Sequence, residues 1–79
     1  MTVEEKKRAY EKILRIGDYT LINRHTKFEP WIVCWKFDDE SYTWNQGHYF
    51  QGAIFAILFM IGREYPEKLI EAAESIKEN

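Results

Sequence analysis

The stretch Trp31-Ile32-Val33-Cys34-Trp35-Lys36-Phe37 gives the clearest strand signal in the chain. Its bulky residues recur at every second position, which is the pattern of a β-strand with two different faces. Pro30, just before it, has no backbone amide and suits only the first position or an edge of a strand. The stretch therefore predicts a sheet in which one face carries Trp31, Val33, Trp35 and Phe37, and the other carries Ile32, Cys34 and Lys36.

The residues after this strand predict a hairpin. Asp38–Ser41 is a polar four-residue turn, and a return strand is expected over Tyr42–Asn45. Pairing across this turn gives two aromatic pairs, Phe37 with Tyr42 and Trp35 with Trp44. We expect the resulting aromatic sheet face to look towards the helices, and its members are Trp31, Trp35, Tyr42 and Trp44.

Helices are expected on both sides of these strands. Thr2 and Glu5 have the spacing of a capping box at a helix start, and Gly17 suits the left-handed cap at a helix end. The fold class predicted is α+β in one domain over residues 1–79, with a three-stranded antiparallel sheet, helices on one face and the order α-β-β-β-α-α. Besides the hairpin, the expected elements are a helix over Val3–Ile16, a strand over Tyr19–Arg24, a helix over Tyr49–Glu64 and a helix over Pro66–Lys77.

The helix expected over Tyr49–Glu64 has more apolar surface than a small sheet can cover. Its apolar run Ala53–Ile61 is far shorter than the roughly 20 residues of a membrane-spanning helix. A main stripe of core positions follows the 3.6-residue repeat: Phe50, Ala53, Ile54, Ile57, Leu58 and Ile61. Soluble monomers rarely expose a large apolar patch, so we expect a homodimer or partner interface from the residues outside the stripe, namely Phe55, Ala56, Phe59 and Met60. The alternative is that the last helix wraps round and covers them.

Composition excludes several classes of protein. The chain has 79 residues, 46% hydrophobic and 30% charged, so it is not disordered. Its net charge of −2 gives no overall positive field for nucleic acid or anionic lipid. The single cysteine, Cys34, forms no internal disulfide, and residues 2–8 have no signal-peptide core. We expect a cytoplasmic protein that contacts neither nucleic acid nor membrane.

Residues able to carry chemistry are few. A nucleophilic Cys34 would need a base within hydrogen-bond reach, and nothing forces His25 or His48 near it. The histidines and carboxylates lack metal-ligand spacing. We therefore expect no catalytic residue, no metal and no cofactor. The alternative is a small ligand-binding protein or minor enzyme with a pocket around Cys34, Asn45 and His48.

Two resemblances bear on function. The α-β-β-β-α order resembles the double-stranded-RNA-binding domain, but the lysines which that family places after the sheet are replaced by the lysine-free stretch 51–56. Trp31–Trp35 followed by Thr43–Phe50 resembles a pattern in short uncharacterised proteins of Gram-positive bacteria and their prophages. That group has no activity to carry over, so the resemblance implies only a small intracellular protein of bacterial or phage origin, and such proteins often act by binding a host protein. The function expected is a non-catalytic protein-binding or regulatory module that self-associates through an apolar helix.

Overall fold

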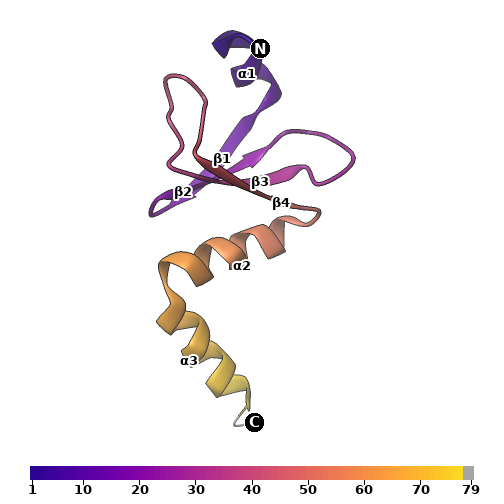
Figure 1. Ribbon diagram of the computed structural model, residues 1–79. Helices are drawn as coiled ribbons and strands as arrows, with labels where there is room; N and C mark the ends of the chain where they lie inside the picture. Colours follow the sequence, from indigo (N-terminus) through magenta and orange to yellow (C-terminus); the bar gives the residue numbers. More distant parts are fainter. Residues whose placement is uncertain (78–79) are drawn as a thin grey trace.

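The protein is an α+β chain with one four-stranded antiparallel sheet and three helices. A computed structural model describes residues 1–77 (Figure 1). The strands follow one another across the sheet in the order β1-β2-β3-β4. The observed elements are α1 (Val3–Ala9), β1 (Glu11–Ile16), β2 (Tyr19–Asn23), β3 (Trp31–Trp35), β4 (Gln46–Phe50), α2 (Ala53–Glu64) and α3 (Pro66–Lys77).

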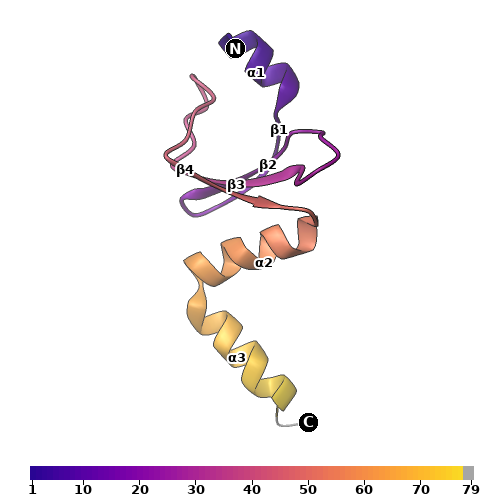
Figure 2. The same cartoon turned by 45° about the vertical axis from the view of Figure 1, so that its right-hand side comes forward.

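The sheet has a hydrophobic cluster on each face, because its central strands β2 and β3 are buried on both sides. Helix α2 covers one face, while α1 and the loop after β3 lie over the other (Figures 1 and 2). Helices were expected on one face only, so that part of the prediction is wrong. The fully buried members on the α2 side are Leu21, Val33, Ala56 and Met60. The buried members on the opposite side are Ile22, Ile32, Cys34 and Phe37.

The first helix is half as long as predicted, and the missing half is a strand. The Thr2–Glu5 capping box is present, and each of its two hydrogen bonds measures 3.2 Å. Gly17, however, does not end a helix: with φ +58° it lies in the tight turn that joins β1 to β2. Pairing with β2 brings Leu14 and Ile16 onto the α2-side cluster. The pairing outweighs the local helical preference of this segment, so the sheet has four strands instead of three.

The predicted hairpin register is wrong by two residues. Trp35 lies opposite Gln46 instead of Trp44, and the return strand is β4, not Tyr42–Asn45. The segment between β3 and β4 forms a narrow loop closed by an isolated bridge between Asp38 and Thr43. Consequently Tyr49 and Phe50, expected in the helix, belong to β4, and α2 begins only at Ala53.

The expected aromatic sheet face is split between the two sides of the sheet. Lys36 has φ +58°, and this left-handed residue breaks the alternation of the strand. Trp31 packs on the α2 side, whereas Tyr42 and Trp44 pack with Phe37 on the opposite side. Trp35 is half-buried, and the Lys36 ammonium lies 5.5 Å from the centre of its ring. One aromatic sheet face was predicted, but the aromatic side chains are divided between the two faces.

The β1–β2 turn at Gly17 and Asp18 contacts the end of α2. A Glu64 Oε1 oxygen accepts a hydrogen bond from the Asp18 backbone amide at 2.8 Å. A Cβ on Gly17 would lie 2.2 Å from the Glu64 carboxyl carbon, and the residue's φ is one that alanine adopts poorly. The Gly17→Ala variant should therefore lose about 2 kcal/mol in free energy of unfolding, measured by urea denaturation.

Gly52→Ala is the matched control for this prediction. Gly52 has an extended backbone, and its added Cβ would meet only the exposed Phe55 ring, at 3.1 Å. Its substitution should cost no more than about 1 kcal/mol, the usual cost of alanine at a helix N-cap. Equal losses in the two variants would contradict the special role of Gly17.

Candidate functional site

Helices α2 and α3 carry five of the large apolar side chains that are exposed in residues 1–77. On α2, Ile54 and Phe55 are 70% and 68% exposed, and Leu58, one turn on, is 46% exposed. On α3, Ile70 and Ile76 are also exposed. Soluble monomers seldom leave such a set in water. We call this set the C-terminal apolar surface, and its members are Ile54, Phe55, Leu58, Ile70 and Ile76.

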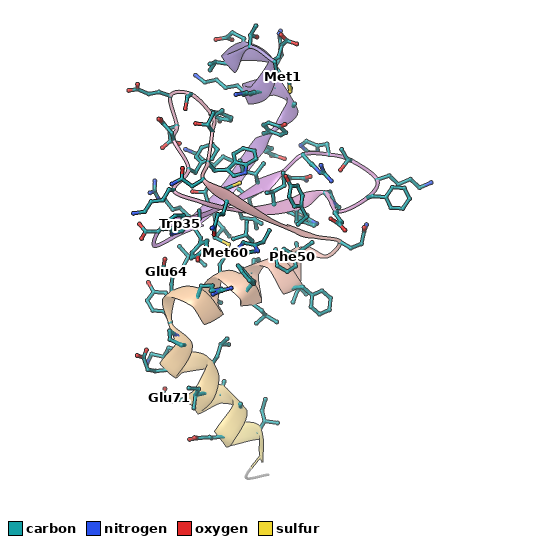
Figure 3. The ribbon with its side chains drawn as sticks, viewed as in Figure 1. Met1, Trp35, Phe50, Met60, Glu64 and Glu71 are labelled. Atoms are coloured by element: carbon teal, nitrogen blue, oxygen red, sulfur yellow. The ribbon has the colours of Figure 1, made fainter. Side chains whose placement is uncertain are left out.

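The predicted interface residues do not lie together on this surface. Phe55 does, but Ala56 and Met60 are fully buried against the sheet with Leu21 and Val33. In Figure 3, Met60 lies between α2 and the sheet. The placement of Ala56 and Met60 in an interface is therefore wrong for the chain as folded. The small Ala56 side chain lets the helix backbone approach the strands, and the flexible Met60 fills the remaining space.

Phe59 is half-buried at the side of the same interface between α2 and the sheet. Its ring centre lies 4.6 Å from that of His48, 5.4 Å from that of Phe50 and 6.2 Å from that of Tyr19. The Arg63 guanidinium covers it at 4.9 Å. Phe59 thus contributes to the fold. Its substitution would disturb the packing of α2 on the sheet and would not test an interface with another chain.

Helix α3 projects from the body of the molecule. It packs against α2 and points away from the sheet (Figures 1 and 2). Leu69, which is partly buried, fits against Gly62, where an added Cβ would lie 2.7 Å from Leu69 Cδ1. In residues 66–76, no side chain of α3 is fully buried. The expectation that the last helix could wrap round α2 is therefore wrong.

The projecting helix makes the molecule long and its surface large. The principal extents are 51 × 25 × 16 Å, and the radius of gyration is 14.4 Å. A compact chain of this length would have a radius of about 11.6 Å. The accessible surface is 5663 Å², whereas about 5,100 Å² is normal for a monomer of this mass. The chain therefore exposes about 600 Å² more than a compact monomer would.

A second surface lies on the opposite side of the sheet. An open groove of about 200 Å³ runs between α1 and the loop after β3. The Tyr10 and Trp44 rings meet edge to face at 5.7 Å, and Phe37 stacks behind Trp44 at 6.1 Å. This aromatic groove is smaller than the roughly 300–1,000 Å³ of most small-molecule sites. Its lining residues are Lys6, Tyr10, Tyr42, Thr43 and Trp44.

The acidic loop tip beside the groove is anchored to the sheet. Asp39 forms an ion pair with Lys12 of β1. The hydrogen bond from the Lys12 ammonium lowers the pKa of the Asp39 carboxyl below its usual value. Asp38 accepts a hydrogen bond from the Glu40 amide at 2.9 Å. Two of the acidic side chains at the tip are thus engaged within the chain.

The alternative pocket around Cys34, Asn45 and His48 is not assembled. Cys34 is buried on the face opposite α2, and burial raises the pKa of its thiol to about 12. His48 is half-buried and packs on Phe59, which belongs to the α2 side. The sheet therefore separates the thiol from the imidazole, so His48 cannot serve as its base.

Neither metal-binding clusters nor membrane-spanning helices are found in residues 1–77. That part of the chain holds no group of three or more histidine, cysteine or acidic side chains able to share a metal ion. None of its helices is both long and apolar enough to cross a lipid bilayer.

Sequence reasoning missed most residues of both surfaces. Ile54 and Leu58 were assigned to the core because α2 is apolar on nearly every face, so that periodicity does not single out the buried side. Tyr10 was placed inside a helix, where no contact with Trp44 could be foreseen. The Gly17-Asp18 pair between two apolar runs is a hairpin signal that could have revealed β1.

No protein-family model, no curated protein sequence and no solved structure matches this chain.

Proposed function

We propose that this chain is a small non-catalytic protein-binding module that self-associates through the C-terminal apolar surface. The observation that carries the proposal is the exposure of Ile54, Phe55 and Leu58 on one side of α2. These residues follow one another at helical spacing and form a stripe. Burying such a stripe against another chain supplies the hydrophobic driving force for association.

The proposal also fits the rest of the molecule. The buried residues of α2 already secure it to the sheet, so its outer side is free for a partner without loss of the fold. The separation of Cys34 from His48 removes the most direct arrangement for nucleophilic catalysis. The resemblance to short proteins of Gram-positive bacteria and their prophages carries over no activity, and it adds only a host protein as a further partner to this proposal.

The test is the mass of the folded protein in solution. Size exclusion with light scattering at tens of micromolar should give twice the chain mass of 9.6 kDa. Phe55→Glu should reduce it to a single chain, because a carboxylate at this position would lose its hydration on association. Since Phe55 is 68% exposed, the variant should keep the circular dichroism spectrum of the wild type.

Phe28→Glu is the matched control for this experiment. Phe28 is 74% exposed, but it lies in the loop before β3 and not on the C-terminal apolar surface. It should leave the mass of the wild type unchanged. A wild type of single-chain mass, or dissociation by both substitutions alike, would overturn the proposal.

Because no pocket is assembled around Cys34, Asn45 and His48, the small-ligand alternative is better placed at the aromatic groove. Its volume of about 200 Å³ fits one side chain of a partner better than a whole metabolite. Lys7, whose ammonium lies 5.9 Å from the centre of the Tyr42 ring, adds positive charge beside it. The groove thus favours a peptide contact over enzyme chemistry, which leaves the binding module as the better-supported function.

A further inference from the structure

We infer that the partner at the C-terminal apolar surface is a second copy of this chain, and that the two copies exchange α3. In this arrangement, α3 of each copy lies on the outer side of α2 of the other. The inference rests on the proposed function and adds that α3 of one copy is the element that covers α2 of the other. Four features of the structure support it: the α2–α3 connection, the match between the two helices, the exposed area and the charges.

The connection between α2 and α3 prevents α3 from covering α2 of its own chain. Only Tyr65 separates the two helices. Antiparallel helix pairs usually need a loop of about 2–5 residues. The contact of Leu69 with Gly62 further sets the direction of α3, which points away in both views (Figures 1 and 2). The stripe of Ile54, Phe55 and Leu58 is therefore left open to another chain.

The two helices match each other as packing partners. Each has 12 residues and is therefore about 18 Å long. On α3 the apolar residues Ile70, Ala73 and Ile76 recur at helical spacing and are exposed. They give α3 one apolar side of its own, which has no cover within residues 1–77. An α3 placed on the outer side of another copy's α2 would cover both uncovered surfaces at once.

The exposed area agrees with a dimer. Each chain exposes about 600 Å² more than a compact monomer of its mass. Two chains that bury this excess would bury about 1,200 Å² in total, which is the lower end of the range for stable interfaces. Because each α3 covers the other chain's α2, the contact is reciprocal and closes after two copies.

Charge adds one contact that the exchange can make. Helix α3 carries Glu67, Glu71 and Glu74 together with Lys68 and Lys77, and the Lys68 ammonium lies 3.8 Å from the Glu71 carboxylate, so charge alone does not keep two copies of α3 apart. The charged residues of helix α2 are Arg63 and Glu64. Within residues 1–77 the Arg63 guanidinium makes no ion pair and lies over Phe59. It is available to a carboxylate from the partner's α3.

The experiment mixes two variants that are each defective on one side of the exchange. Phe55→Lys damages the outer side of α2, and Ile70→Glu damages the apolar side of α3. Each variant alone should be a folded single chain, since every contact in its homodimer pairs one intact helix with one damaged helix. In the mixture, an intact α3 meets an intact α2, and the new glutamate meets the new lysine. The mixture should therefore give a species of two chains at concentrations where each variant alone remains single.

Other outcomes separate this inference from the proposed function. If Ile70→Glu alone keeps the wild-type dimer, α2 pairs with α2 and the exchange is wrong, while self-association stands. If Phe55→Lys alone keeps the wild-type dimer, α3 pairs with α3. The exchange is then also wrong, while self-association stands. A mixture that stays single, or a wild type that forms open polymers, also overturns the exchange. A wild type of single-chain mass overturns the proposed function itself.

Discussion

Met60→Ala is expected to lower the free energy of unfolding by about 3 kcal/mol, the usual cost of removing a large side chain from a packed core. Met60 is fully buried and lies against Leu21, Val33 and Ala56. Met60 is the larger of the two fully buried side chains of α2, the other being Ala56, so a cavity would remain between helix and sheet. For a domain of this size the loss should lower the melting temperature by about 12–24 °C.

Phe55→Ala is the matched control for Met60→Ala. It removes a larger side chain from the same helix, but from its outer side, where 68% of the residue is exposed. Its effect on the unfolding of a single chain should stay within about 0.5 kcal/mol. Because association stabilises the folded state, both variants must be compared at a concentration where the wild type is a single chain. A larger loss for Phe55→Ala would mean that α2 is turned differently on the sheet.

The orientation of α2 shows where sequence reasoning stopped. The helix itself was foreseen, because its apolar residues recur with a helical period and Pro66 follows its end. The side of α2 that faces the sheet was predicted wrongly. The prediction placed Ile54 and Leu58 in the core and Met60 outside it. Volume, and not hydrophobicity, decides this choice: the close approach needs the small Ala56 at the centre of the contact. A count of apolar residues carries no information about such complementarity.

The strands show a similar limit. The alternation in Trp31–Phe37 correctly identified β3, but alternation predicts two unlike faces, whereas β2 and β3 are buried on both. The backbone reversal at Lys36 could not be foreseen, because lysine has no special preference for a positive φ. Beyond Lys36, Phe37 packs with Trp44 on the face opposite α2, on the side of the aromatic groove. The candidate surfaces thus depend on tertiary features that local patterns do not encode.

Cys34 is expected to resist thiol reagents as long as the protein is folded. Burial raises the pKa of the Cys34 thiol from 9.0 to about 12. At pH 8 about one thiol in 10,000 would then be ionised, compared with about one in ten in the unfolded chain, and only the thiolate reacts. Labelling with a disulfide reagent should therefore be at least about 1,000-fold slower in the native protein than in urea.

The same pKa shift predicts how stability depends on pH. Since the pKa is higher in the folded state, the unfolded chain loses its thiol proton first as the pH rises above 9. The stabilisation of the folded state by the protonated thiol is complete below pH 9 and is lost between pH 9 and about 12. Cys34→Val lacks this titration, so the wild type should lose stability relative to the variant across that interval. Rapid labelling of the native protein, together with parallel pH profiles, would show that Cys34 is open to solvent and restore it as a candidate nucleophile.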